Sequence, residues 1–159
     1  MNLITYGHHL SPRRFRTVYN SRRLGSINKP GGGIWSSPVN SKLGWKDWCR
    51  AEGFRVSKLR RYTTFSISDD LKIFKVVTRS DYQTLLKKYG KDNEFGGRIV
   101  SRIIDWEALV NDGYRGFWLT ETGFLENRYL FSADLGFYSW DCETVVLFYW
   151  EDLENISRH

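Results

Sequence analysis

Sequence patterns typical of strands occur near both ends of this chain, and patterns typical of helices are interspersed with them. Runs of β-branched and aromatic residues predict strands at 3–6, 62–67, 71–77, 114–120, 128–132 and 144–150, with a short strand after the glycines at 31–33. Apolar residues at helical spacing predict helices at 12–24, 42–52, 81–89 and 106–112. This order is typical of a mixed α+β domain.

Capping residues set the predicted limits of these helices. The expected N-caps are Ser11 before Pro12, Ser41, Ser80 in a capping box with Gln83, and Asp105. Gly25, Gly53, Gly90 and Gly113 are expected to end the helices. The predicted apolar faces are Phe15, Val18 and Tyr19 on the first helix, Trp45, Trp48 and Cys49 on the second, Tyr82, Leu85, Leu86 and Tyr89 on the third, and Trp106, Leu109 and Val110 on the fourth.

The length and composition predict a single domain over residues 1–159. No repeat, low-complexity tract or long linker divides the 159 residues. Aromatic residues make up 16% of the chain, so the core is expected to contain large rings beside β-branched residues. No apolar stretch approaches the roughly 20 residues that span a bilayer, and the N-terminus has no signal core, so we expect a cytoplasmic protein without a membrane partner. Cys49 and Cys142 are expected to be buried free thiols.

Charge is distributed unevenly along the chain, whose overall net charge is +6. Residues 1–61 hold 13 Lys and Arg against two acids, a net charge of +11. Residues 62–159 hold 11 Lys and Arg against 16 acids, a net charge of −5. A basic N-terminal half indicates a surface that meets phosphates, whether of a nucleic acid or of a dinucleotide. The alternative is a solvated basic face that binds no partner.

Several common catalytic and binding motifs are missing from the sequence. The three histidines are His8, His9 and His159, and no Cys/His spacing fits a zinc site. The triple glycine at 31–33 is not followed by Lys-Ser/Thr, as a phosphate-binding P-loop requires. It is also not the dinucleotide glycine fingerprint, because no helix follows it directly. No nucleophile-elbow pattern supports a Ser-His-Asp triad.

Three short clusters carry the remaining chemistry: residues 6–11, 33–37 and 140–143. If 140–143 are extended, Asp141 and Glu143 point to one side and form a pair of carboxylates beside an apolar strand. Partial burial and a neighbouring like charge both raise the pKa of a carboxyl group, which is typical of functional acids. Each cluster also has a purely structural interpretation. His9 would bond a backbone carbonyl, the glycines would form a flexible turn and Trp35 would belong to the core. Asp141 and Glu143 would lie on the solvated face of an edge strand.

The order of these clusters resembles the ADP-ribosyltransferase-like superfamily, including small uncharacterised bacterial and phage members. In that superfamily a His-x-Ser/Thr step ends the first strand, and here His9-Leu10-Ser11 looks like it. A Gly-rich loop then leads to a strand with an aromatic residue and Ser or Thr, which Gly33-Ile34-Trp35-Ser36 resembles. A late strand carries an acid, and here Asp141 or Glu143 looks like that acid. The aromatic is usually Tyr rather than Trp, and the late acid is usually Glu with Gln or Glu two residues earlier.

The resemblance implies split antiparallel β-sheets with flanking helices and NAD as the substrate. It implies that His9 holds the adenosine ribose, that backbone groups at Leu10 bind the nicotinamide amide, and that Trp35 stacks on the nicotinamide. Ser11 and Ser36 would orient the ribose, and Gly33 would shape the loop. Cleaving the nicotinamide–ribose bond builds positive charge on the ribose, and a fixed carboxylate, Asp141 or Glu143, stabilises that charge. Arg13, Arg14 and Arg16 would meet the pyrophosphate or an acceptor.

The expected function is therefore transfer of ADP-ribose from NAD to a macromolecule, with nucleic acid slightly favoured over protein as the acceptor. A related variant hydrolyses NAD. The alternative is a non-catalytic nucleic-acid- or protein-binding module, such as an inhibitor of a nucleic-acid-processing or defence complex. That alternative rests on basic residues interleaved with aromatics, such as Arg13, Arg14, Phe15 and Arg16, and then Arg60, Arg61 and Tyr62. A toxin, an anti-defence factor and a housekeeping enzyme all remain open.

Overall fold

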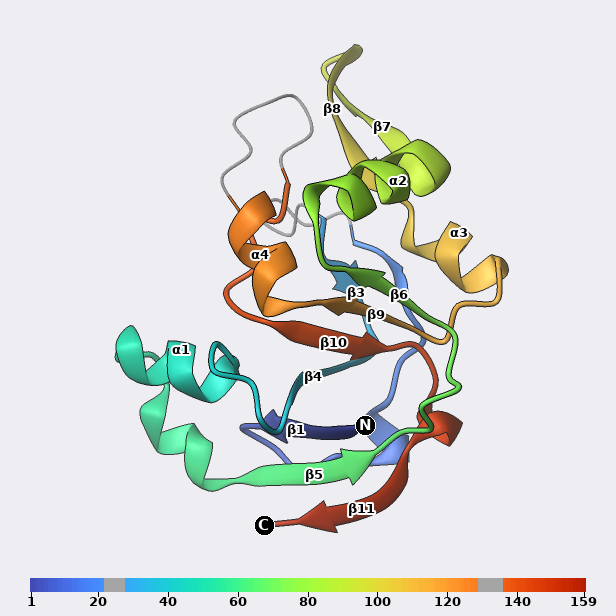
Figure 1. The fold of residues 1–159 in the computed structure, drawn as a ribbon. Helices are drawn as coiled ribbons and strands as arrows, with labels where there is room; N and C mark the ends of the chain where they lie inside the picture. Colours follow the sequence, from blue (N-terminus) through green and yellow to red (C-terminus); the bar gives the residue numbers. More distant parts are fainter. Residues whose placement is uncertain (22–27, 129–135) are drawn as a thin grey trace.

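The molecule is built on a seven-stranded mixed sheet, seen in a computed structural model that describes residues 1–21, 28–128 and 136–159 (Figure 1). The sheet order is β11-β5-β1-β4-β10-β9-β6. The strands are β1 (Asn2–Tyr6), β4 (Ile34–Pro38), β5 (Tyr62–Ser66), β6 (Ile73–Val76), β9 (Gly116–Leu119), β10 (Thr144–Leu147) and β11 (Glu154–Arg158). Neighbouring strands are antiparallel except β6 and β9, which run parallel. The sequence expectation of a mixed α+β domain is confirmed at this level.

Two small hairpins and several helices complete the fold. The hairpins pair β2 (Tyr19–Asn20) with β3 (Pro30–Gly31), and β7 (Gly90–Phe95) with β8 (Arg98–Ile104). The α-helices are α1 (Trp45–Ala51), α2 (Arg79–Tyr89), α3 (Trp106–Asn111) and α4 (Glu121–Asn127). Short 3-10 turns are η1 (Pro12–Arg14), η2 (Val56–Arg60) and η3 (Trp150–Asp152). In Figure 1, α2, α3 and α4 gather at the β6–β9 end of the sheet, whereas α1 and η2 lie beside β4 and β5.

The core occupies both faces of the sheet, as β10 shows. All four β10 residues are buried, and Val146 packs into one apolar cluster while Val145 and Leu147 pack into another. The first cluster is rich in rings, including Trp106, Phe117, Phe124, Phe137 and Trp140. Trp106 meets Phe117 edge-on at 5.0 Å between ring centroids. The expected core of large rings is therefore present, and its edge-to-face contacts add to the stability gained by burial.

The predicted helix at 12–24 is wrong. Among the described residues of this range, only Pro12–Arg14 is helical, and the backbone of Phe15 is already extended, with φ −66° and ψ 140°. Phe15 and Val18 pack against different core clusters, which a single helical face cannot do. The segment instead pairs as β2 with β3. Residues 22–24 of the predicted helix lie outside the described residues.

Other helices and strands begin or end at residues that differ from the predicted ones. The capping box of α2 uses Thr78 and Asp81 instead of Ser80 and Gln83: the Asp81 N–H donates to the Thr78 hydroxyl at 3.3 Å, and the Asp81 carboxylate accepts from the Thr78 N–H at 2.8 Å. The helix at 42–52 starts at Trp45 with Gly44 as N-cap, so Ser41 does not cap it. Arg128 follows α4, where a strand had been predicted, and residues 129–132 lie outside the described residues. The sequence patterns also missed α4, the β7–β8 hairpin and β11.

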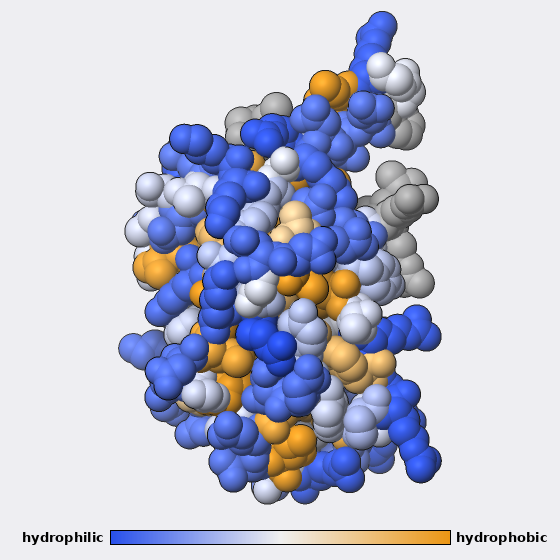
Figure 2. All heavy atoms as spheres, turned by 90° about the vertical axis from the view of Figure 1, so that its right-hand side faces the viewer, coloured by the Kyte–Doolittle hydropathy of each residue, from blue (hydrophilic) through white to orange (hydrophobic). Residues whose placement is uncertain are grey.

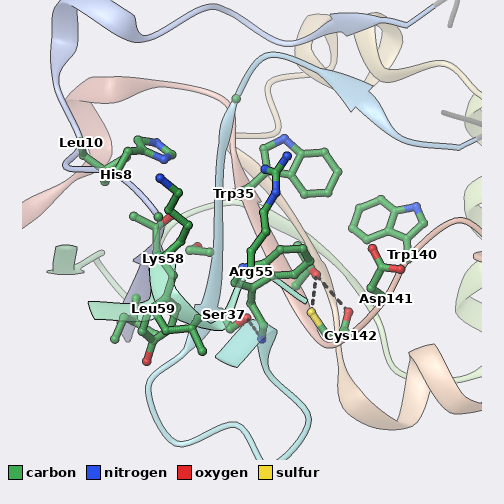
Figure 3. A pocket seen from close by; sticks show the side chains of 18 of the residues that line it. His8, Leu10, Trp35, Ser37, Arg55, Lys58, Leu59, Trp140, Asp141 and Cys142 are labelled. Carbon is green, nitrogen blue, oxygen red and sulfur yellow. Dashed lines mark hydrogen bonds between the residues drawn. The ribbon is translucent and has the colours of Figure 1, made fainter. Parts of the chain in front are cut away.

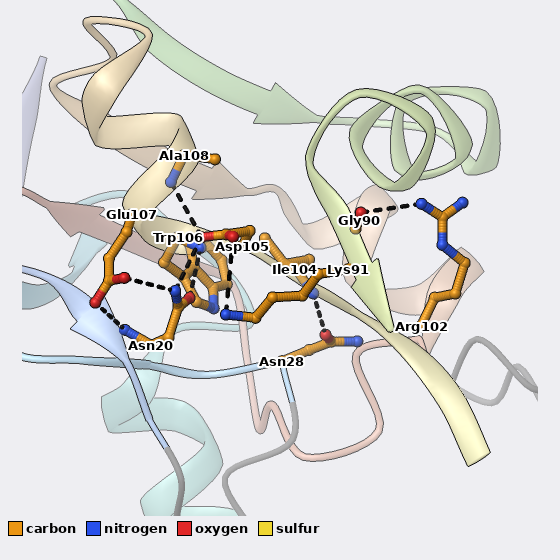
Figure 4. A network of polar contacts seen from close by, with 10 residues as sticks. All are labelled: Asn20, Asn28, Gly90, Lys91, Arg102, Ile104, Asp105, Trp106, Glu107 and Ala108. Atoms are coloured by element: carbon orange, nitrogen blue, oxygen red, sulfur yellow. Dashed lines mark hydrogen bonds and ion pairs between the residues drawn. The ribbon is translucent and has the colours of Figure 1, made fainter. Parts of the chain in front are cut away.

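Two asparagines tie the β2–β3 region to α3 and β8 (Figure 4). The Asn20 amide donates to Asp105 Oδ1 at 2.9 Å and to Glu107 Oε2 at 3.0 Å, and its oxygen accepts from the Trp106 N–H at 2.8 Å. Asn28 is 3% exposed and accepts from the Ile104 N–H at 2.9 Å. The Asn28 bond holds the chain directly before Lys29, which lies in the candidate site described below.

The face of the molecule that carries α3 is mostly hydrophilic. Figure 2 looks at the side of the molecule that carries α3, and apolar side chains there are interspersed with hydrophilic ones. Exposed large apolar residues include Ile99 and Val100 at the β7–β8 hairpin, and Leu125 on α4. Within the described ranges, no helix combines the length and apolarity needed to cross a membrane.

Candidate functional site

A cavity of about 560 Å³ lies where the ends of β1 and β4 face η2 and the segment that leads into β10 (Figure 3). Its walls come from segments far apart in the sequence: residues 4–8 and 10, 29, 33 and 35–37, 45, 55 and 58–59, and 140–142 and 144. The volume falls within the range of pockets that hold small molecules and cofactors. Its lining mixes aromatic rings, cationic side chains and one carboxylate, which makes it the best candidate site among the described residues.

The glycine turn places the Trp35 ring in the cavity wall. Gly33 has φ 70°, and a Cβ there would lie 2.8 Å from Val146 Cγ1, so only glycine fits this turn. The Gly33 N–H donates to the Arg16 carbonyl at 2.9 Å, and the Trp35 indole N–H donates to the Gly32 carbonyl at 3.0 Å. The Trp35 ring lies 5.1 Å from the ring of Trp140, which also lines the cavity. The indole is therefore held from two sides.

Asp141 brings a carboxylate into the cavity, and Lys29 pairs with it. The ammonium lies 3.3 Å from Asp141 Oδ2, and the side chains are 26% and 33% exposed. Asn28 holds this corner together, because its carbonyl accepts from the Trp140 indole N–H at 2.7 Å. The Asn28 amide also donates to the Gly136 carbonyl at 2.8 Å. One buried asparagine thus connects the segment of Lys29 to the segment of Asp141.

Two serines of β4 brace the floor of the cavity. The Ser36 hydroxyl donates to the Val145 carbonyl at 3.0 Å, and the Ser37 hydroxyl donates to the Glu143 carbonyl at 3.0 Å. Ser37 also accepts from the Trp45 N–H at 3.1 Å, which fixes the start of α1 beside the cavity. These hydroxyls join β4 to the 143–145 segment and to α1, so their role in this structure is to support the walls.

The thiol of Cys142 lies in the same wall and is neutral at physiological pH. Burial raises the pKa of the Cys142 thiol to about 12, and hydrogen bonding to Thr144 opposes that shift. Cys142 is 2% exposed, and both Cys142 and Cys49 are buried free thiols, as expected from the sequence. A thiol with so high a pKa is a poor nucleophile, because the reactive species is the thiolate.

Cationic side chains line the side of the cavity opposite β4. Arg55 and Lys58 extend from η2 and the residue before it toward the end where Trp35 and His8 lie (Figure 3). Lys29 adds a third positive charge. Tyr6 also lines the cavity, and burial raises the pKa of its hydroxyl, with the Asp47 carboxylate raising it further. A positively charged wall facing an aromatic wall suits an anionic ligand that carries flat rings.

The structure brings five of the predicted site residues together in this cavity: Leu10, Gly33, Trp35, Ser36 and Asp141. Their proximity follows from sheet order, because β4 lies between β1 and β10. The Leu10 N–H already donates to the Thr63 hydroxyl at 3.2 Å. That N–H is therefore engaged, which counts against the predicted contact between this donor and a nicotinamide amide.

Three predicted site residues, His9, Ser11 and Glu143, do not line the cavity. His8 lines it in place of His9, whose Nδ1 is enclosed without a hydrogen-bond partner among the described residues. Glu143 is 7% exposed and accepts from the Trp118 indole N–H at 3.0 Å. The predicted pair of carboxylates on one face is wrong, because residues 140–143 form no strand and the Glu143 N–H instead donates to the Leu43 carbonyl.

Lys29, Arg55 and Lys58 line the cavity but were not among the residues predicted for the site. The excess of basic residues in 1–61 was a signal for them, but the expected phosphate-binding arginines were Arg13, Arg14 and Arg16. These three are exposed and do not line the cavity. Nothing local distinguishes Arg55 and Lys58 from these three arginines, because only the fold brings η2 to the cavity.

The described residues contain no cluster of three His, Cys, Asp or Glu side chains able to hold a metal ion. Compared with models of protein families, with curated proteins and with solved structures, the chain matches none.

Proposed function

We propose that the cavity binds NAD and that the chain transfers ADP-ribose from NAD to a macromolecular acceptor. The observation that carries this proposal is the lining of a single cavity, which combines an indole, a carboxylate and three cations. NAD has a cationic nicotinamide ring, a scissile ribose bond and an anionic pyrophosphate. Each of these parts has a chemical counterpart in the lining.

The indole and the cations account for binding. A cationic ring is attracted to the face of an indole, so Trp35 is the proposed platform for nicotinamide. Arg55 and Lys58 are the proposed partners of the pyrophosphate, because guanidinium and ammonium groups make short charge-assisted bonds to phosphate oxygens. Lys29 pairs with Asp141. A bound pyrophosphate would compete for this ammonium.

Asp141 accounts for the chemistry. The bond between nicotinamide and C1′ of the ribose breaks, and its electron pair leaves with neutral nicotinamide. The positive charge that develops on the ribose is stabilised by the carboxylate, as in glycoside cleavage. An acceptor oxygen or nitrogen then bonds to C1′, and its proton passes to Asp141 or to solvent. With water as the acceptor, the same steps give NAD hydrolysis.

Asp141→Asn tests this proposal, since it keeps the side-chain size and removes the charge. The protein is incubated with adenylate-labelled NAD and a mixture of protein, RNA and DNA, and nicotinamide release and label transfer are measured. We expect Asp141→Asn to lower the rate about 100-fold or more while NAD binding persists. The matched control is Glu143→Gln, which keeps the acceptor for the Trp118 indole outside the cavity and should retain the wild-type rate.

Nicotinamide release that is equal in wild type and Asp141→Asn would reject the catalytic role. No release with any acceptor, or with water, would reject the enzyme and favour the alternative, a non-catalytic binding module. That module would bind its partner equally well in both proteins, because its affinity would depend on the basic residues of the rim.

A further inference from the structure

An aromatic cluster adjoins the cavity on its outer side. The indoles of Trp45 and Trp48 stack with 5.0 Å between centroids and 24° between planes. Phe54 meets both indoles at a steep angle, with centroids 6.0 Å from Trp45 and 5.4 Å from Trp48. Both indoles are half-buried, and Phe54 is 39% exposed. The cluster therefore presents ring surface to solvent.

Unpaired positive charge lies on the η2 side of these rings. Residues 53–68 contain four basic residues and no acid. The four are Arg55, Lys58, Arg60 and Arg61, and all are exposed. Across the part of the chain that the structure describes, none of the four forms an ion pair. The Arg55 guanidinium lies 5.2 Å from the centre of the Phe54 ring, so charge and aromatic surface meet directly.

This surface is continuous with the cavity. Trp45, Arg55 and Lys58 belong to the cavity lining, whereas Trp48, Phe54, Arg60 and Arg61 do not. A chain-like ligand that lay along the outer residues would therefore reach the cavity mouth. We call the seven residues together the α1–η2 surface.

We propose that the α1–η2 surface binds single-stranded nucleic acid and presents it to the cavity as the acceptor. Exposed rings beside cations match a strand whose bases stack and whose phosphates carry charge. In a duplex the base faces are already stacked on one another, so the rings favour unpaired bases. The role of the strand as acceptor rests on the proposed function, whereas its binding to the α1–η2 surface does not.

Binding is tested with the full chain, without NAD, by fluorescence anisotropy of labelled oligo-dT and oligo-U of 12 nucleotides. Arg60→Ala combined with Arg61→Ala removes two exposed charges outside the cavity. If each contacts a phosphate, the slope of log affinity against log salt should fall in magnitude by about 1.4. Phe54→Ala should weaken binding about tenfold through lost stacking. The control combines Lys87→Ala with Arg98→Ala, which removes two exposed charges from α2 and β8 and should change neither quantity.

Comparing the affinities for oligo-dT and oligo-U shows whether binding depends on the sugar of the strand. The proposal is overturned if the Arg60/Arg61 variant keeps the wild-type salt slope, if a duplex binds as tightly as a single strand, or if polyglutamate binds in preference to both oligonucleotides. Oligonucleotide binding without NAD cleavage would keep this inference and reject the proposed function. NAD cleavage without oligonucleotide binding would do the reverse.

Discussion

Asn28 is the residue whose loss should be most informative about how the fold supports the cavity. It is 3% exposed and has φ 55°, in the left-handed region. Its side chain accepts from the Ile104 N–H at 2.9 Å and donates to the Gly136 carbonyl at 2.8 Å. Asn28→Ala leaves both backbone groups buried and unpaired.

The expected loss follows from these contacts. An unpaired buried polar group costs about 1–3 kcal/mol, and two such groups arise here. Alanine in the left-handed region adds about 1 kcal/mol, because asparagine tolerates that conformation better. We expect Asn28→Ala to lower the free energy of unfolding by about 3–7 kcal/mol, measured by equilibrium urea denaturation with an unchanged m-value.

Asn155→Ala is the matched control. Asn155 also has a left-handed backbone, with φ 51°, and its amide donates to the Ser66 hydroxyl at 2.8 Å. That contact is exposed, so water replaces it, and the expected loss is about 1 kcal/mol from the backbone alone. The difference between the variants isolates the burial contribution. Equal losses in the two variants would refute the reasoning that the buried Asn28 bonds hold this region.

Two further predictions concern the helix α4 and the cavity thiol. Gly123→Ala should destabilise the protein by about 1–3 kcal/mol although alanine favours helices, because its Cβ would lie 2.2 Å from the Val76 carbonyl oxygen. The loss is measured by thermal unfolding. The control is Thr122→Ala at an exposed position of the same helix, which should stay within about 0.5 kcal/mol of wild type. Burial raises the pKa of the Cys142 thiol from its ordinary 9.0 to about 12. The neutral buried thiol therefore contributes stability that is fully present below about pH 9 and is lost as the pH rises toward 12. Cys142→Ala should therefore show a shallower fall in unfolding free energy between pH 8.5 and about 10.5 than wild type. A steeper fall in the variant would contradict the assignment.

Elements whose signals are local were predictable from the sequence. For α3, the Asp105 carboxylate accepts from the Ala108 N–H at 3.1 Å, and Gly113 follows the helix with φ 78°, as predicted. The apolar face of α2 is buried at each of its predicted positions. Both cases depend only on residues within one or two turns, so neighbours along the chain contain the information.

The segment after β1 shows where local patterns failed. Its apolar spacing fitted a helix, but Phe15 and Val18 pack into clusters associated with opposite faces of β10. The Arg16 carbonyl accepts from the Gly33 N–H, a partner far along the chain. Long-range pairing therefore outweighed a weak helical preference.

The candidate site divides in the same way. Residue types indicated Leu10, Gly33, Trp35, Ser36 and Asp141, and sheet order brings them to one cavity. Only the tertiary structure separates Asp141 from Glu143, since each carboxylate finds a different partner, Lys29 or Trp118, from a distant segment. Only the tertiary structure brings Arg55 and Lys58 to the opposite wall. The spacing of residues along the chain specifies which side chains share a face of a helix or strand. Strand order and loop packing determine which distant side chains meet, and this order and packing depend on the free energy of the whole core.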